Sequence, residues 1–436
     1  MHLLAELSGK LAESIHGGAS GGARTWGGSH VRVHPSLGLA RWLACIGLGL
    51  VTTHGATLPT LGAAPTLTPI VVWIPEEYHT GGAYTAIQAG PDGRVYLGTT
   101  FYDGFARFLA LPPGGQQFQL IANMASATGE LTPGPYAQAK IHTKPVVAPD
   151  GKVYFGTKSG KPAKDERWQA SYPGGHLLVY DPQTNRTSDL GIIRPRQSII
   201  AVGVDPQRSI VYALTDPDGH LNIYDPLTRT FSDKGVLSPG PAPTRYLVVL
   251  ANGDAVHPAG ADAFIRYRAA SGTIERLPLQ FSGRGSYESP YALAASPDGT
   301  RFHGVGEDSG QVYTFMPGDR AIAVQLHGAA APEGYSQRSN HYTMTAAPDG
   351  NMYYTDIVLA GPPEGTLFLM RLVTRTGQPE IVGQVGSLPP PPVPLQRRTG
   401  RRLMVQGSTA SPDGTLYVML AYPLRVLIFP RLASRP

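Results

Sequence analysis

Short apolar runs separated by a glycine turn recur along the chain. In the segment VVAPDGKVY, which begins at Val146, one apolar run precedes the turn Pro149-Asp150-Gly151 and a second run follows it. Glycine suits the positive φ of a tight turn, and aspartate can bond its own backbone there. The pattern therefore predicts a β-hairpin. Similar segments begin at Ala89, Val204, Leu250, Ser296, Ala347 and Ser411.

The spacing of these hairpins predicts the fold. They lie roughly 45 to 65 residues apart, and short strands repeated at such a period are typical of a β-propeller, in which each repeat is one four-stranded blade. No segment shows the 3.6-residue apolar period of a helix. We therefore predict an all-β chain that forms a seven-bladed β-propeller of four-stranded antiparallel blades.

Each end of the repeated region holds a strand without a hairpin partner. The segment TPIVVWI at 68–74 precedes the first hairpin, and LRVLIF at 424–429 follows the last one. A propeller closes its ring when one terminus completes a blade begun by the other, which also removes open sheet edges. We expect the N-terminal strand to join the last blade in this way.

Composition excludes some classes of function but does not identify one. The 436 residues include 53 glycines and 41 prolines, as expected of a fold with many turns. Only 15% of residues are charged, which argues against a disordered acidic chain and against a nucleic-acid partner. The net charge of +5 slightly favours anionic partners. The single cysteine, Cys45, excludes intramolecular disulfides and multi-thiolate zinc sites. Separately, we expect the protein to be a monomer.

The first part of the sequence is typical of an exported protein. Residues 1 to about 30 are rich in glycine and serine, and basic residues then precede the apolar run LACIGLGLV at 43–51. Such a run indicates a secretory signal, because it is shorter than the ~20 residues that span a membrane. We predict a disordered segment with a signal peptide or uncleaved anchor at 1–64 and the propeller at 65–436. Export to the periplasm, cell surface or medium follows, with membrane contact only through an uncleaved anchor.

Loop lengths predict which face of the propeller holds a site. The turns within the hairpins are tight, whereas the second-to-third loop at 158–175 and the connections into several blades are long. Long loops on a rigid scaffold usually carry the binding residues. We therefore place a ligand site at the elaborated mouth of the central channel, opposite the glycine turns.

Several side chains at this mouth could do chemistry. Nine residues before the turn glycine stand Tyr84, His142 and His341. Imidazole, phenol and cationic groups around one mouth suit proton transfer beside an anion. The candidate catalytic residues are His142, His341, Tyr246, Tyr342 and Arg245. The candidate ligand-binding residues are Tyr84, Lys144, Tyr102, Tyr287, Glu288, Tyr291, His257 and Arg338.

Simpler interpretations stand beside these. A histidine at the start of an inner strand commonly packs and forms hydrogen bonds, and tyrosines commonly pack at a rim. His176 and His220 recur before third strands, away from the axis, and are expected to stabilise their blades. The cofactor is unknown, and a divalent metal held by the spread histidines is one alternative. No G-x-S-x-G elbow, phosphate-cradling loop or HExxH motif is present.

Residues 68–436 resemble exported bacterial seven-bladed propellers. The PDG-x-x-Y hairpins and the strand GGHLLVYDP are similar to those of quinoprotein-like, streptogramin-lyase-like and gluconolactonase-like propellers. KIHTKPVVAPDGKVYFGT followed by YPGGHLLVYDP resembles the propeller polysaccharide lyases that cleave uronic-acid polymers. The chain departs from quinone dehydrogenases, which have tryptophan docking motifs, and from WD40 blades, which have G-H and W-D pairs.

Three functions remain open. The first is a secreted propeller that binds an anionic carbohydrate or other ligand at the elaborated face, without assured catalysis. The second is a polysaccharide lyase acting by β-elimination, in which His142 or His341 is the base and Tyr246 or Tyr342 the acid. Arg245, Lys144 or a bound metal would screen the carboxylate. The third is a metal-dependent lactonase-like hydrolase.

Overall fold

The structure is a computed structural model that describes residues 64–80, 82–161, 171–240, 242, 244–283, 285–330, 338–339, 342–358, 366–390, 404–421 and 423–433. All of these belong to one compact unit, Leu61–Pro436. The predicted signal segment lies outside the described residues. The secondary structure is almost entirely strand, as the sequence predicts.

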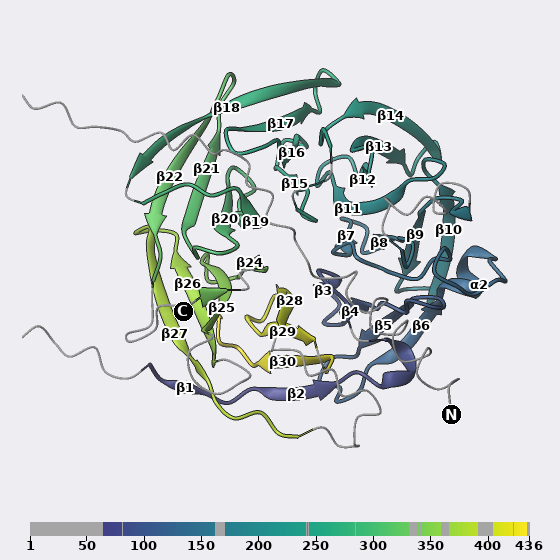
Figure 1. Cartoon of the computed structure of the whole chain (residues 1–436), viewed down its shortest axis with the longest axis horizontal. Coiled ribbons are helices and arrows are strands. Elements are labelled where there is room, and N and C mark those ends of the chain that lie inside the picture. The colour runs from purple at the N-terminus through teal and green to yellow at the C-terminus, as the bar shows by residue number, and fades with distance from the viewer. Residues whose placement is uncertain are drawn as a thin grey trace, which may run out of the picture. The chain divides into compact units, whose positions relative to one another are not determined.

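Three sheets of four antiparallel strands follow one another in chain order (Figure 1). The first contains β3 (Ile87–Ala89), β4 (Val95–Gly98), β5 (Arg107–Leu111) and β6 (Gln119–Asn123). The second contains β7 (Val146–Val147), β8 (Val153–Gly156), β9 (His176–Asp181) and β10 (Arg186–Ile192). The third contains β11 (Ser198–Val204), β12 (Val211–Asp216), β13 (His220–Asp225) and β14 (Thr230–Val236).

The next two groups of four strands are joined into one eight-stranded sheet, which the sequence does not predict. The first group is β15 (Val248–Val249), β16 (Ala255–Pro258), β17 (Ala263–Arg268) and β18 (Thr273–Gly283). The second is β19 (Pro290–Ala295), β20 (Phe302–Gly306), β21 (Val312–Pro317) and β22 (Ile322–Gly328). The joint forms because β18 continues past β17 and pairs in parallel with β22.

The N-terminal strands contribute to the last two sheets. A six-stranded sheet contains β1 (Thr66–Leu67), β23 (Arg338–Ser339), β24 (Met344–Ala346), β25 (Met352–Val358), β26 (Thr366–Val373) and β27 (Gln378–Val385). The last sheet contains β28 (Met404–Ala410), β29 (Leu416–Ala421), β30 (Arg425–Phe429) and β2 (Ile70–Trp73). The antiparallel pairing of β2 with β30 is the pairing predicted from the two orphan segments.

The described ranges contain two short helices. The 3-10 helix η2 (Glu76–Tyr78) follows β2, and the α-helix α2 (Met124–Thr128) follows β6. The Asn123 side chain caps α2 by accepting a hydrogen bond from the backbone N–H of Ala125 at 3.1 Å. No helix among the described residues is long and apolar enough to cross a membrane.

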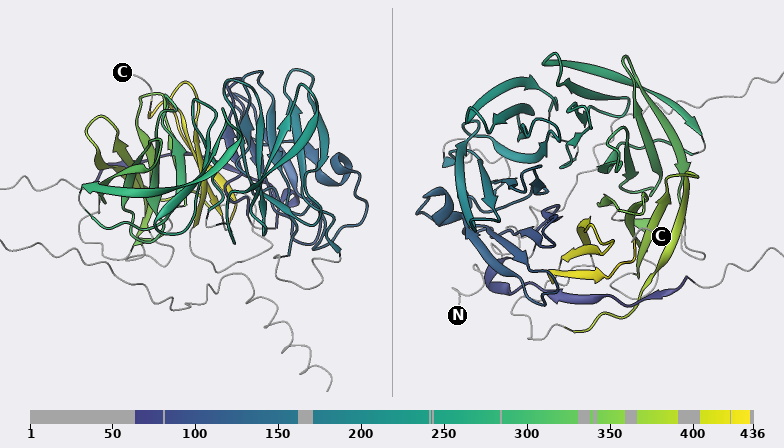
Figure 2. Two further views of the ribbon diagram at one scale, coloured as in Figure 1. Left: turned by 90° about the horizontal axis from the view of Figure 1, so that it is seen from above. Right: turned by 180° about the vertical axis from the view of Figure 1, so that it is seen from behind.

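The predicted turn chemistry is present. Gly151 has a φ of 83°, and the Asp150 carboxylate accepts a hydrogen bond from the backbone N–H of Lys152 at 3.1 Å. Residues before the first strand and after the second therefore lie at the end of each hairpin opposite its turn. Figure 1 shows the sheets around a common axis with their first strands nearest to it, and Figure 2 shows them from above and from behind.

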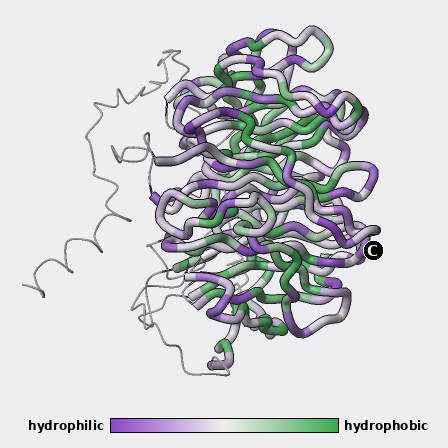
Figure 3. The backbone as a smooth tube through the Cα atoms, turned by 90° about the vertical axis from the view of Figure 1, so that its right-hand side faces the viewer, coloured by the Kyte–Doolittle hydropathy of each residue, from purple (hydrophilic) through white to green (hydrophobic). Residues whose placement is uncertain are grey.

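The core lies between neighbouring sheets. Phe108 on β5 and Phe155 on β8 are fully buried, and their rings stack with centroids 4.0 Å apart. Phe264 on β17 packs against Phe302 on β20 and Phe315 on β21 of the next group, with ring centroids 5.3 and 5.1 Å apart. Burial of each such ring stabilises the fold by about 1.5–3 kcal/mol. Figure 3 shows hydrophobic stretches along the strands and hydrophilic ones in many of the turns.

Candidate functional site

Two tyrosines from the first hairpin begin the site. Tyr84 precedes β3 and Tyr102 follows β4, so both lie opposite the glycine turn, and their hydroxyl oxygens are 2.7 Å apart. Tyr84 has a φ of 51°, which costs a residue with a side chain about 1–3 kcal/mol. The Gln406 side-chain oxygen holds this conformation, because it accepts hydrogen bonds from the backbone N–H groups of Ala83 (2.8 Å) and Tyr84 (2.9 Å).

Arg245 extends from the fourth group of strands to the first. It precedes β15, yet its guanidinium carbon lies 4.8 Å from the centre of the Tyr84 ring. The same guanidinium donates a hydrogen bond to the Tyr291 hydroxyl, and its carbon is 6.0 Å from the Tyr291 ring. Both rings are within the range of a cation–π contact. Arg245 thus links side chains from three groups of strands at this end of the axis.

His142 lies beside Tyr84. The two ring centroids are 3.7 Å apart, and the His142 Nε2 lies 3.4 Å from the Thr100 hydroxyl. The imidazole is only 3% exposed, and its buried Nδ1 has no hydrogen-bond partner among the described residues. Burial, followed by the charges of Lys140 and Arg245, holds the pKa of His142 well below its usual value. The side chain is therefore neutral at pH 7.

Lys140 is the residue that the sequence prediction missed. Its ammonium lies 4.7 Å from the centre of the Tyr102 ring, and the side chain is almost fully buried. Two reciprocal backbone hydrogen bonds, of 2.9 and 2.8 Å, place Lys140 beside Lys158. Burial, then the charges of Lys158 and Arg245, lower the pKa of Lys140 to about 7. The alternation of strand side chains puts Lys140 on the face of His142, two positions away, which was the available signal.

The carboxylates near Lys140 are bonded to other groups. Asp216 accepts a hydrogen bond from Lys158. Glu307 forms a hydrogen bond with the Tyr342 hydroxyl, and burial followed by this bond raises the pKa of Tyr342. In the part of the chain that the structure describes, Lys140 has no ion pair with a carboxylate.

The remaining phenols at the mouth differ in their hydrogen bonds. Tyr246 donates to the backbone carbonyl of Tyr342 at 2.9 Å, and burial raises the pKa of Tyr246. The Tyr291 and Tyr342 rings pack with centroids 4.8 Å apart. Burial also raises the pKa of Tyr291 despite the nearby Arg245 charge. The structure therefore brings together seven predicted residues and adds Lys140. These eight residues, the mouth cluster, are Tyr84, Tyr102, Lys140, His142, Arg245, Tyr246, Tyr291 and Tyr342.

A cavity of about 280 Å³ continues from the mouth along the axis. Its walls come from the first strand of every group or from the one to three residues before it, as at Lys144, and Arg245 lines its mouth end. The Lys144 ammonium donates a hydrogen bond to the backbone carbonyl of Ser408 at 2.9 Å. Burial lowers the pKa of Lys144 to about 8.

Three other predicted ligand-binding residues have packing or hydrogen-bond contacts outside the mouth cluster. Tyr287 packs between the rings of Phe281 (4.8 Å) and Tyr313 (5.2 Å), away from the axis. Glu288 accepts hydrogen bonds from the loop at 308–309. His257 is fully buried, with its nitrogens 3.1 and 3.4 Å from backbone carbonyls, and burial lowers its pKa to about 4.

The other predicted histidines and Arg338 have different outcomes. His176 lies 2.8 Å from Asp189, and His220 lies 2.8 Å from Asp233, as expected of residues that stabilise their own sheets. His341 lies outside the described residues, as does the side chain of Arg338. No group of three or more histidine, cysteine, aspartate or glutamate side chains in the described ranges could hold a metal ion.

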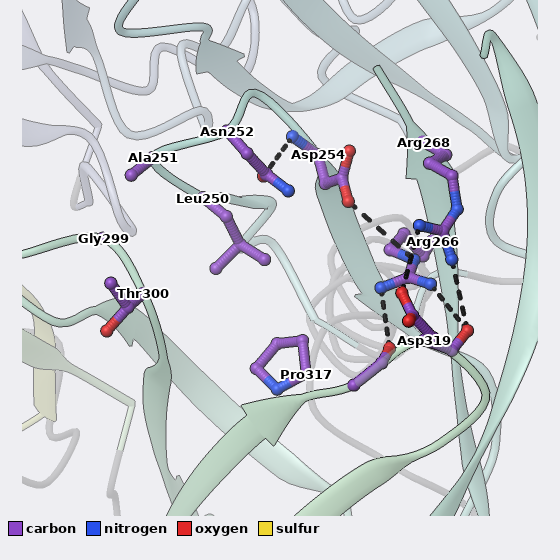
Figure 4. Close-up of a pocket in the computed structure, with 11 residues that line it drawn as sticks. Leu250, Ala251, Asn252, Asp254, Arg266, Arg268, Gly299, Thr300, Pro317 and Asp319 are labelled. Atoms are coloured by element: carbon purple, nitrogen blue, oxygen red, sulfur yellow. Dashed lines mark hydrogen bonds and ion pairs between the residues drawn. The ribbon is translucent and has the colours of Figure 1, made fainter. Parts of the chain in front are cut away.

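A second pocket, of about 470 Å³, lies near the glycine turns (Figure 4). Its buried arginine, Arg266, already has partners: it donates to Glu275 at 2.7 Å and to the carbonyls of Gly318 and Asp319 at 2.9 and 3.0 Å. Asp254 lies 3.9 Å from the same guanidinium. These contacts join neighbouring groups of strands, so we interpret this pocket as a structural junction.

Comparisons with known proteins show the fold. No protein-family model matches the chain, and no curated protein matches it. The RRP9 WD40 repeats match with a TM-score of 0.52 and 10% identity, over 79% of this chain and 94% of that one. The β-propeller domain of Cps50 (Swd1) from Myceliophteria thermophila matches with a TM-score of 0.52 and 11% identity, over 80% and 97%.

A chain of the mitotic checkpoint complex matches with a TM-score of 0.53 and 12% identity, over 91% of this chain and 98% of that one. The fold is a β-propeller. These likenesses include WD40 propellers, although the chain lacks the W-D pair of WD40 blades. At such low identity they concern the fold alone, and the resemblance to quinoprotein-like, streptogramin-lyase-like and polysaccharide-lyase propellers stays a prediction.

Proposed function

We propose that this propeller binds a carboxylate-bearing carbohydrate, such as a uronic-acid polymer, at the mouth cluster. The observation that supports the proposal is the excess of buried positive charge. Burial, followed by the charges of Lys158 and Arg245, lowers the pKa of Lys140 to about 7. Of these three cations, Lys158 alone is paired with a carboxylate among the described residues. A ligand carboxylate would supply the missing negative charge in a partly desolvated site, where it counts most.

The aromatic residues around these cations fit the same ligand. Tyr84, Tyr102, Tyr291 and Tyr342 present ring faces and hydroxyls beside Arg245 and Lys140. Sites for small polar ligands commonly combine apolar walls with a few placed polar groups. Ring faces would pack on sugar rings while the cations bind the carboxylates.

Calorimetry with polygalacturonate, dextran and poly-glutamate tests the proposal. Binding of polygalacturonate should weaken at least about tenfold in Lys140→Met, because one charge-assisted contact is lost. Lys152→Met is the matched control, since this exposed lysine is at a glycine turn and paired with Asp150. Equal binding of neutral dextran would overturn the proposal. Preference for poly-glutamate would indicate an acidic protein partner, as for a scaffold propeller.

The second candidate is a β-elimination lyase, favoured by the Tyr84–Tyr102 hydroxyl pair beside Arg245. The C5–H and C4–O bonds of a uronate would break, a C4=C5 double bond would form, and the proton would reach the leaving oxygen. Arg245 would lie against the carboxylate. His142, at 3% exposure, fits a positioning role under Tyr84 better than that of the base itself.

Ultraviolet absorbance of unsaturated uronate tests this second candidate. Wild type should generate the signal, and Tyr84→Phe should abolish it. Tyr287→Phe should keep it, because Tyr287 is a half-buried tyrosine packed against Tyr313 away from the axis. Binding without any absorbance change would leave the first proposal standing and refute the lyase.

We also propose that the strand groups form a closed ring of seven blades in an exported, monomeric protein. The β2–β30 pairing and a cavity lined from the first strand of every group support the ring. Sequencing of the mature N-terminus tests export: a mature chain beginning before residue 40 would refute it.

A further inference from the structure

The cavity along the axis has a charge that its walls leave without a counterion. Most of its lining is aliphatic, from residues such as Val146, Val202 and Leu293. Lys144 and Arg245 are its charged residues, and the lining contains no carboxylate. Lys144 has no ion pair within the described ranges, and its one hydrogen bond there is to the Ser408 carbonyl. An ammonium has three N–H donors, so two remain for another acceptor.

Lys144 is half-buried, and an ammonium partly withdrawn from water in a mostly aliphatic cavity costs free energy unless it is paired. A methionine or leucine at position 144 would fill the same space without that cost. The feature is therefore better explained by a ligand that brings its own negative charge than by packing. Arg245, at the mouth end of the cavity, is itself a cation that contacts Tyr84 and Tyr291, so it supplies no counterion for Lys144.

We propose that this cavity binds a small carboxylate with an apolar body, its carboxylate against the Lys144 ammonium and its hydrocarbon part between the aliphatic walls. The volume of about 280 Å³ is nearly twice that of the ~150 Å³ apolar cavity that accepts benzene. An alkanoate of medium chain length, or an aryl-alkanoate, fits this volume. A polysaccharide chain does not, so this ligand is distinct from the one proposed for the mouth.

The charge on Lys144 gives the proposal a pH signature. Carboxylate binding favours the ammonium form, and burial lowers the pKa of Lys144 to about 8 in the free protein. Above that pH the free lysine is neutral, and binding must take up a proton. The affinity should therefore be constant below pH 8 and fall about tenfold per pH unit between pH 8 and 10.

The test is calorimetry on the full chain with acetate, hexanoate and 4-phenylbutyrate, and with hexanamide as the neutral analogue. Hexanoate or phenylbutyrate should bind, and acetate and hexanamide at least about tenfold more weakly. Lys144→Met should remove hexanoate binding and its pH dependence, whereas Lys152→Met should change neither. Ala346→Leu, which fills the cavity from β24 and keeps the lysine, should also weaken binding.

The outcomes separate this proposal from the one for the mouth. No binding of any carboxylate to wild type would overturn it, as would hexanoate binding that Lys144→Met leaves unchanged. Loss of hexanoate binding in Lys140→Met alone would assign the ligand to the mouth and overturn it too. If polygalacturonate fails to bind but hexanoate binding depends on Lys144, the cavity proposal stands and the mouth proposal falls.

Discussion

Replacing Lys140 with methionine should stabilise the protein, and most strongly at low pH. Lys140 is only 7% exposed, and burial followed by two neighbouring cations lowers its pKa from 10.5 to about 7. The folded state therefore binds the lysine proton more weakly than the unfolded state does. This group opposes folding at every pH below about 10.5, and its penalty shrinks as the pH rises from 7 towards that value.

The magnitude follows from the two pKa values. A difference of about 3.5 units corresponds to a penalty of about 5 kcal/mol below pH 6, since each unit is worth 1.36 kcal/mol. At pH 9 the folded lysine is neutral, and about 2 kcal/mol remains. The wild-type free energy of unfolding should thus gain about 2.5 kcal/mol between pH 6 and 9 from this residue alone.

Urea denaturation of wild type and Lys140→Met from pH 6 to 9 measures this gain. The difference between the two proteins cancels the titration of all other groups. It should favour the variant by several kcal/mol at pH 6 and shrink as the pH rises. Lys152→Met is the control, because its bond to Asp150 raises the pKa of Lys152, which then titrates above this range. Two parallel curves for wild type and Lys140→Met would refute the desolvated ammonium.

Three further substitutions test the scaffold, each by urea denaturation at pH 7. Arg266→Met should lower the free energy of unfolding by about 3 kcal/mol, because it removes a buried guanidinium with three acceptors. The control Arg276→Met, at an exposed arginine, should lower it by under ~1 kcal/mol. Equal losses would contradict a structural junction at Arg266. Gly151→Ala should cost about 1 kcal/mol through its φ of 83° alone, since its Cβ would meet no atom within 4 Å; no loss would show that the turn relaxes. Gln406→Ala should lower the free energy of unfolding by about 2 kcal/mol, because the backbone N–H groups of Ala83 and Tyr84 lose their acceptor. The same variant should also bind polygalacturonate more weakly. Unchanged binding would show that Tyr84 needs no such support.

The fold was predictable because its signal is local and repeated. Asp150 and Gly151 specify one turn, and the same two residue types recur in most copies of the hairpin. The β2–β30 pairing was predictable because each terminal strand lacks a neighbour in sequence. The parallel joint of β18 with β22 was not, since it depends on how far one strand extends past its partner.

The site was only partly predictable because it depends on contacts between distant strands. Residues shortly before the first strand of a blade are expected at the channel mouth. This rule was enough to nominate Tyr84, His142, Arg245 and Tyr342. The same rule also nominated Tyr287, whose ring packs on Tyr313, because it cannot tell an inner strand from the connection that precedes it. Lys140 was missed since its character comes from burial beside Lys158 and Arg245, which the order of residues does not record.

Lys140 and Lys144 lie at different depths along the axis, and their pKa values differ. Burial and then two cationic neighbours lower the pKa of Lys140 at the mouth to about 7, whereas burial alone lowers the pKa of Lys144 in the cavity to about 8. A ligand carboxylate at either place would raise the pKa of the lysine that it contacts. Proton uptake that accompanies binding should therefore peak at a higher pH for hexanoate than for polygalacturonate. If both ligands gave the same profile, a single anion site would account for the mouth and the cavity together.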